Sequence, residues 1–208
     1  MKLRIASLTL LCLALAVIPA SAQVLYSNGS VNGTTDAWTI NFGYTVSDTF
    51  TANGTMTGFD FYTWLFPGDS VLTVDWQVTS AEFGGTTYGS GTSNVTNSFI
   101  STNQYGYDIN KETVSGLNLA LNGSYWLNLN NATSAQGNPV YWDENSGKSQ
   151  ASESALGTIP SEAFDINGGT TTTSSSTTST GTVPEPSSIM LFGSGILGLA
   201  GVLRRKLF

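Results

Sequence analysis

The sequence predicts an all-β fold, specifically a single antiparallel β-sandwich of jelly-roll type. Apolar and polar residues alternate along several segments, which is typical of strands with one buried face. Gly, Ser, Thr and Asn are dense between residues 23 and 168, and no stretch there has a helical period, so we expect hardly any helix. Turn-forming residues recur about every eight to twelve residues, a spacing typical of sandwiches and barrels.

The strongest strands are expected where the alternation is strictest. These are residues 38–46, 59–65 and 72–78, and the second ends at Phe66-Pro67-Gly68. Residues 117–121 and 125–129 also alternate, and Asn122-Gly123-Ser124 between them predicts a tight hairpin because Asn-Gly tolerates positive φ. Gly84-Gly85 predicts a second hairpin. Weaker strands are expected over 24–26, 49–51, 97–101, 107–109, 140–142 and 164–166. A β-solenoid is disfavoured because no segment repeats at a fixed length.

The first 22 residues have the pattern of a secretory signal peptide. Lys2 and Arg4 precede an apolar stretch over residues 5–18, which is too short to cross a bilayer. The small residues Ala20 and Ala22 then form a cleavage site, so the mature chain is expected to begin at Gln23. Cys12 lies inside this segment, which excludes a disulfide framework from the mature chain.

Residues 23–167 are expected to form one domain with an acidic surface. Thirteen of the chain's fourteen acidic residues lie in this range, against only Lys111 and Lys148. Such a surface repels nucleic acid. The chain contains no histidine, which excludes Ser-His-Asp triads and His-ligated metals. Carboxylates, Tyr and the two lysines remain for chemistry, and the sequence leaves open whether calcium binds. We assign no cofactor, no metal site and no catalytic residues.

From Gly168 through Thr182 every residue is Gly, Ser or Thr. This composition predicts a flexible linker with a reach of roughly 20–23 Å. Beyond it, Pro184-Glu185-Pro186 prevents an earlier helix start, and residues 187–203 predict an apolar helix. At ~1.5 Å per residue this helix would span roughly 25 Å, about the low limit for a membrane crossing. The basic residues that follow mark the cytoplasmic side: Arg204, Arg205 and Lys206.

A Pro-Glu-Pro motif, an apolar helix and a basic terminus, in this order, resemble the PEP-CTERM sorting signal. Here the matching residues are Pro184, Glu185, Pro186, Arg204, Arg205 and Lys206. The resemblance implies an exported protein of a Gram-negative bacterium that makes extracellular polysaccharide. It also implies transient insertion in the inner membrane, cleavage near the motif by an exosortase, and then release or transfer to the cell surface or matrix. Residues 23–167 carry no motif of an identified enzyme family.

Three functions are compatible with these observations. The first is a non-enzymatic structural or adhesive role in the extracellular polysaccharide matrix. The second is a carbohydrate-binding module whose aromatic rings stack on sugars; its candidate residues are Trp64, Trp126, Tyr141, Trp142 and Asp143. The third is a glycoside-active enzyme, which needs two carboxyl groups ~5–9.5 Å apart. Asp143 or Glu144 would supply one of these groups, and Asp60, Asp75 or Glu82 the other.

Overall fold

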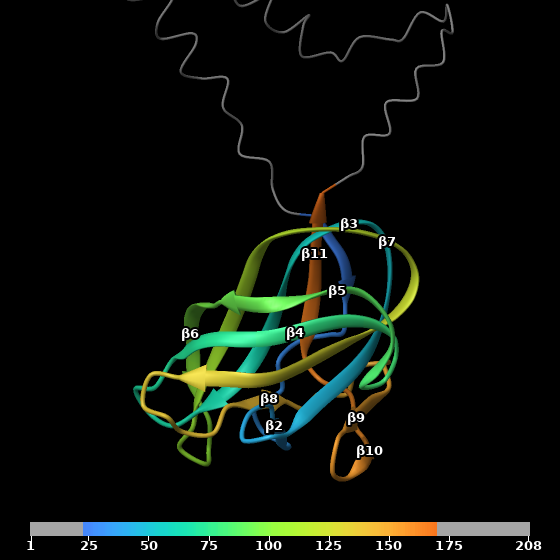
Figure 1. Cartoon of the computed structure of the whole chain (residues 1–208). Helices are drawn as coiled ribbons and strands as arrows, with labels where there is room; N and C mark the ends of the chain where they lie inside the picture. The colour runs from blue at the N-terminus through green and yellow to red at the C-terminus, as the bar shows by residue number, and fades with distance from the viewer. Residues whose placement is uncertain (1–22, 170–208) are drawn as a thin grey trace, which may run out of the picture. The chain divides into compact units, whose positions relative to one another are not determined.

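Two long strands, β3 (Thr45–Leu65) and β7 (Asp108–Ser134), form the centre of the fold. They pair antiparallel from Thr45↔Asn130 to Leu65↔Asp108. Figure 1 shows both strands rising on one side of the domain, passing over its top and descending on the other side. The sheet built on them is therefore bent back over itself.

The bend coincides with a β-bulge in β3 between Met56 and Gly58. A Cβ atom at Gly58 would lie 2.2 Å from the carbonyl oxygen of Val114, so only glycine allows the two backbones to approach this closely. The bulge also changes which residues face the core. Before it the apolar residues of β3 that face the core are even-numbered, as at Met56, and after it they are odd-numbered, as at Phe59 and Phe61.

The computed structural model describes residues 23–169, and within that range the chain forms strands and turns without any helix. Eleven strands join into one antiparallel sheet with the order β1-β11-β3-β7-β4-β5. Their bounds are β1 (Gln23–Ser27), β11 (Phe164–Gly169), β4 (Val71–Ala81) and β5 (Gly84–Asn94). Strand β6 (Thr96–Thr102) pairs with the first part of β7. The all-β, antiparallel prediction is confirmed.

Four short strands extend the other edge of β3. Strand β8 (Tyr141–Asp143) pairs with the end of β3 and with β2 (Ala37–Thr39). Strand β9 (Ala151–Glu153) pairs with the start of β3 and with β10 (Gly157–Ile159). The segment between β7 and β11 is thereby fixed against β3 at both ends.

The core lies between the two halves of the bent sheet. Phe59 on β3 packs edge-on against Trp76 on β4, with ring centroids 6.3 Å apart, although the two strands are not neighbours in the sheet. Phe50 and Phe164 make a similar T-shaped contact at 6.3 Å. These aromatic contacts join strands from both halves, so one continuous core stabilises the domain.

Several predicted strands are confirmed. Residues 72–78 lie in β4, and residues 59–65 form the second half of β3, which ends at Leu65 as expected. The weaker strands correspond to β1, β6, β8, β11 and parts of β3 and β7. The Gly84-Gly85 hairpin is also present, but its turn is at Glu82-Phe83, where Phe83 has a φ of 56°.

The strand predicted over residues 38–46 is wrong. Strand β2 ends at Thr39, and Phe42 and Gly43 adopt φ values of 55° and 91° in a turn before β3 begins at Thr45. The apolar residues of the alternating pattern do not share one buried face here. Ile40 is buried, whereas Phe42 and Tyr44 are exposed to solvent. Alternation therefore does not mark a single strand here.

The hairpin predicted at Asn122-Gly123-Ser124 is also wrong. Strand β7 runs through these residues without reversal, and Asn122 and Gly123 pair with Asn53 and Ala52 of β3. The apolar residues on both sides of Gly123 are odd-numbered and therefore lie on one face of a continuous strand. The long partner strand β3 stabilises the extended conformation that the local sequence does not favour.

The predicted termini lie mostly outside the described residues. This holds for the signal peptide (1–22), residues 170–182 of the linker and the sorting segment with its helix (187–203). Gly168 and Gly169 of the predicted linker are strand residues of β11 and pair with Met56 and Thr55. No helix long and apolar enough to cross a membrane occurs within residues 23–169.

Candidate functional site

Trp142 points into the core. Its side chain is fully buried and packs edge-on against Phe61 and Phe164, while its Nε1–H donates to the carbonyl oxygen of Ala163 at 2.9 Å. No ring face is open to a sugar. The structure therefore does not place Trp142 on an exposed aromatic platform.

Trp64, Asp143 and Tyr141 come together on the opposite face of the sheet. Trp64 is only 6% exposed, and its Nε1–H donates to Asp143 Oδ1 at 2.6 Å. Tyr141 is half-buried and lies directly opposite Trp64 in the pairing of β8 with β3. Sequence reasoning thus selected three residues that are neighbours, but Trp64 and Asp143 are not accessible to a ligand.

Asp143 holds a loop in place. Its two oxygens accept the backbone N–H groups of Asn32 and Gly33, both at 2.7 Å, in addition to the Trp64 indole. Burial raises the pKa of Asp143, and these three hydrogen bonds act in the opposite direction. A buried carboxyl with this many donors is a structural group, because all of its partners belong to the fold.

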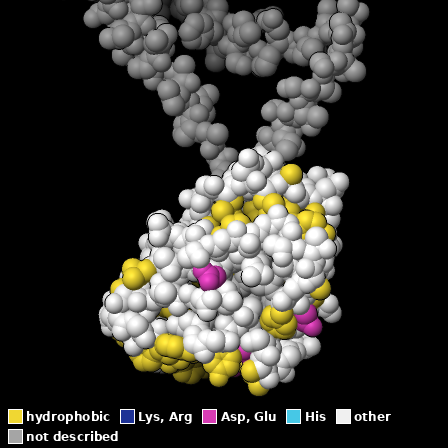
Figure 2. All heavy atoms as spheres, viewed as in Figure 1, with side chains coloured by type: hydrophobic (Ala, Val, Ile, Leu, Met, Phe, Trp, Pro, Cys, Tyr) yellow, Lys and Arg dark blue, Asp and Glu magenta, His cyan; other side chains and the backbone are white. Residues whose placement is uncertain are grey.

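Tyrosines that the sequence analysis did not select cover Trp64. Tyr105 stacks on it with ring centroids 5.8 Å apart, and Tyr107 lies between Trp64 and Tyr141. Tyr105 is 57% exposed, and Phe66 beside Tyr107 is 38% exposed. We call these residues, Trp64, Phe66, Tyr105, Tyr107 and Tyr141, the aromatic surface. Figure 2 shows hydrophobic side chains gathered at the lower end of the domain.

Trp126 lies apart from the other predicted residues. It is half-buried on the outer face of β7, opposite Thr49 of β3 and Thr79 of β4. It lines a cavity of about 340 Å³ together with Glu82, Gln150 and Ser152. Glu82 accepts a hydrogen bond of 2.6 Å from the Ser152 hydroxyl, so its carboxylate is held at the rim of this cavity.

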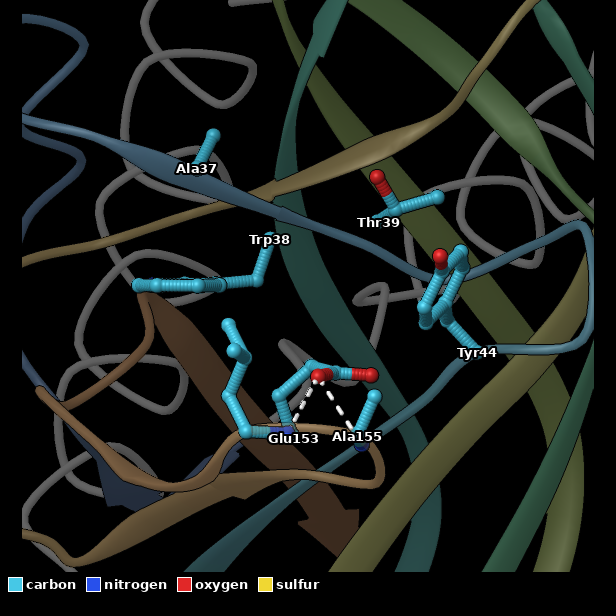
Figure 3. Close-up of a pocket in the computed structure, with 7 residues that line it drawn as sticks. Ala37, Trp38, Thr39, Tyr44, Glu153 and Ala155 are labelled. Carbon is cyan, nitrogen blue, oxygen red and sulfur yellow. Dashed lines mark hydrogen bonds between the residues drawn. The ribbon is translucent and has the colours of Figure 1, made fainter.

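A second cavity, of about 380 Å³, has two aromatic walls, and we call it the aromatic cleft. It is formed by β2, the turn before β3 and the β9–β10 turn, and its lining residues are Ala37, Trp38, Thr39, Tyr44, Glu153, Ala155 and Leu156. Figure 3 shows the rings of Trp38 and Tyr44 on opposite sides of the cleft, with the Glu153 carboxylate between them. Trp38 is fixed from behind by its Nε1–H, which donates to Glu144 Oε2 at 3.1 Å.

The Glu153 carboxylate accepts its hydrogen bonds from the turn that follows it. Its Oε2 accepts the backbone N–H groups of Ala155 and Leu156, both at 3.0 Å, and its Oε1 accepts the Ser154 hydroxyl. The residue is only 3% exposed. The carboxylate therefore orders the β9–β10 turn and presents a negative floor to the cleft.

Three further carboxyl groups are buried inside the domain. Asp48 and Glu112 lie on the core face of β3 and β7, and Glu162 precedes β11; all three are fully buried. Burial raises the pKa of Asp48 to about 7 and that of Glu112 to about 8. The pKa of Glu162 is raised well above its ordinary value by burial and by the nearby charges of Asp48 and Glu144.

These carboxyl groups were missed by the sequence analysis, although a signal was present. Asp48 is in phase with the core residues Val46 and Phe50, and Glu112 is in phase with Val114. Alternation places an acid at a core position in both cases. Neither oxygen of Glu162 and only one oxygen each of Asp48 and Glu112 has a hydrogen-bond partner, which fits carboxyl groups that are kept neutral.

The remaining candidate acids do not meet Asp143. Asp60 is held by Lys111 at 2.9 Å on the face of the sheet away from the core, and Asp75 accepts hydrogen bonds from Thr92 and Asn131. Within residues 23–169 no group of three or more Cys, Asp or Glu side chains is placed to hold a metal ion.

Comparison with known proteins identifies the C-terminal segment. No curated protein matches the chain. Residues 182–206 match the PEP-CTERM protein-sorting motif, and this range includes Pro184, Glu185, Pro186, Arg204, Arg205 and Lys206. The motif implies export and processing at the membrane by an exosortase. The chain is thus similar, over these residues, to exosortase-targeted PEP-CTERM proteins.

Proposed function

We propose that the chain is a non-enzymatic structural or adhesive component of the cell surface or of the extracellular polysaccharide matrix. The observation that carries the proposal is the PEP-CTERM motif at residues 182–206, which follows directly on an all-β domain and a Gly/Ser/Thr segment. Signal peptidase and exosortase would be its processing partners. It would insert in the inner membrane only until the motif is cleaved.

The carboxyl groups of the domain support a role without catalysis. A glycosidase needs an accessible pair of carboxyl groups across the substrate. In the part of the chain that the structure describes, Asp48, Glu112 and Glu162 are buried and Asp143 is used to fix a loop. The aromatic cleft holds only Glu153, whose oxygens are already taken up by its own turn.

The test compares where variants accumulate in a bacterium that has an exosortase. A chain with Pro184→Ala and Pro186→Ala is expected to remain in the inner membrane, because the cleavage motif is lost. A Pro160→Ala chain, changed only in the domain, is the control and should reach the surface fraction like the unaltered protein. Equal surface amounts of all three proteins would contradict the proposal.

The aromatic cleft favours a second candidate function, the binding of a neutral glycan. Jelly-roll-like sandwiches are common among lectins, and the bent sheet supports this interpretation. Tyr44 is 43% exposed, and aromatic rings on both walls could cover the apolar faces of a sugar ring while hydroxyl groups meet the polar floor. Affinity electrophoresis in gels containing neutral polysaccharide tests this idea.

Matched variants locate the site in the same gels. Retardation that is lost on Trp38→Ala but kept on Tyr105→Ala would assign binding to the aromatic cleft. The opposite pattern would assign it to the aromatic surface. An absence of retardation in every neutral polysaccharide would contradict glycan binding.

A further inference from the structure

Strand β5 is an exposed edge of the sheet. In the described part of the chain it pairs only with β4, and it is the last strand of the order β1-β11-β3-β7-β4-β5. In an antiparallel pair, about half of the backbone N–H and C=O groups of an edge strand point away from its neighbour. Eight of the eleven residues of β5 are exposed, and the other three are half-buried.

This edge lacks the features that normally keep edges from pairing. Natural proteins protect edge strands with charged residues, proline, bulges or short length. From Phe83 through Tyr107 the sequence contains no charged residue and no proline. The two register shifts of β5 lie near its turn, and residues 89–94 pair in unbroken register with β4, from Val78 to Thr73. The outer half of β5 is therefore a regular, uncharged strand edge.

The charge distribution favours contact between copies at this edge. The domain carries thirteen acidic residues and two lysines, so two copies repel each other in most orientations. Glu82 lies in the turn before β5, and Asp75 on β4 pairs opposite Thr92 and accepts hydrogen bonds from Thr92 and Asn131. Two β5 edges that face each other bring no like charges into opposition.

Apolar side chains beside β5 provide area that a second strand would cover. Gly89 and Gly91 lie over Leu119 and Trp76, and Tyr88 makes a T-shaped contact with Tyr125 at 4.9 Å while remaining 45% exposed. Figure 2 shows a strip of hydrophobic side chains on the surface between β5 and the arch of β3 and β7, with a few acidic side chains elsewhere on this face. A partner strand beside β5 would cover part of this strip.

We propose that β5 pairs antiparallel with β5 of a second copy of this chain, about a two-fold axis, so that the two sheets become one continuous sheet. An antiparallel pair of identical strands is self-complementary and satisfies the outward backbone groups of both copies. The inference rests on the proposed function in one respect, since the dimer would join surface-held copies of the chain in pairs.

The experiment uses the full chain with Cys12→Ser, so that the only cysteine is one introduced in β5. Single cysteines are placed in turn at each position from residue 89 to residue 94, and exported protein is oxidised on the cells. In a two-fold antiparallel pair a residue meets its own copy only near the axis, because each step along the strand separates the pair by about 7 Å. The Cα atoms must lie within about 7 Å for a disulfide to form.

We expect disulfide-linked dimers at one position or two neighbouring positions of β5. Asn53→Cys, exposed in the central strand β3, is the control and should give none. Adding a lysine at the position next to the best cysteine should lower the dimer yield by up to roughly fivefold, since the two copies of that lysine then lie only about 7 Å apart. No dimer at any of the six positions, or equal dimer yield at Asn53, would overturn the proposal. Processing at the sorting motif is measured separately by mass, so either idea can fail alone.

Discussion

The backbone N–H of Glu162 donates a 2.7 Å hydrogen bond to Asp48 Oδ2 inside the domain, where both carboxyl groups are fully buried. The contact joins β3 to the segment that leads into β11, across 114 residues of sequence. Asn28 extends the contact, because its Nδ2 lies within hydrogen-bonding distance of Asp48, the Ser149 and Ser161 hydroxyls and the Glu162 carbonyl. One polar cluster thus connects β1, β3 and the final strand.

Replacing Asp48 by Asn is expected to remove part of the pH dependence of stability. The pKa of Asp48 rises from 3.8 to about 7 on folding, so the folded state binds this proton more tightly than the unfolded state. Stability from this group is full below about pH 4 and is lost as pH rises through 7. The loss amounts to a few kcal/mol, at about 1.4 kcal/mol per pKa unit. In urea titrations of the exported protein, the free energy of unfolding should fall from pH 4 to pH 8, and Asp48→Asn should reduce this fall. Parallel pH profiles for the wild type and the variant would refute the prediction.

Glu112→Gln should stabilise the protein at alkaline pH. The pKa of Glu112 is raised from 4.5 to about 8 by burial, so the wild-type protein loses stability as pH rises from about 4.5 through 8. Gln keeps the shape and can accept the Thr63 hydroxyl hydrogen bond, but it carries no charge to bury. We expect a gain of a few kcal/mol at pH 9 and little change at pH 4. A variant that is less stable than wild type at both pH values would contradict this reading.

Gly58→Ala should destabilise the domain at the bend of the sheet. The added Cβ would lie 2.2 Å from the Val114 carbonyl oxygen, which forces β3 and β7 apart. We expect a loss of about 1–3 kcal/mol in the free energy of unfolding. Gly84→Ala is the matched control, since no atom lies within 4 Å of the added Cβ there. Equal effects of the two substitutions in urea titrations would argue against the close approach.

Phe59→Ala should show that the two halves of the sheet share one core. Phe59 is fully buried and contacts both Phe61 and Trp76. Truncation is expected to cost about 3–5 kcal/mol, in line with other buried Phe positions. Phe42→Ala, at a residue that is 64% exposed, should change stability by less than about 0.5 kcal/mol. A small effect at Phe59 in thermal unfolding would mean that the halves pack independently.

The sequence predicted the fold class because the alternation is a local signal. It could not separate a strand from a turn at Phe42-Gly43, since an exposed Phe and Tyr happen to continue the pattern. At Asn122-Gly123 the apolar residues keep the same phase on both sides, which is compatible with one long strand. The turn preference of Asn-Gly nevertheless favoured a hairpin in the sequence-based prediction. The pairing with Asn53 and Ala52 that decides the conformation is about 70 residues away in sequence.

The aromatic cleft could not be found from the sequence. Its walls come from Trp38, Tyr44 and the β9–β10 turn, and only the pairing of β9 with the start of β3 brings them together. Trp142 was selected because it is an aromatic residue beside two acids, yet its position opposite Thr63 on β3 directs it into the core. The buried face of a short strand is decided by the strands that pair with it, and the local sequence pattern does not identify these strands.

The most direct test of the account is the intact mass of the exported protein, measured by mass spectrometry in cells with and without an exosortase. With the enzyme present, we predict an N-terminus at Gln23 and a C-terminus within residues 184–187, next to the matched motif. Without it, the chain should begin at Gln23 and still end at Phe208. Recovery of surface protein that retains residues 188–208 in exosortase-containing cells would contradict the central claim.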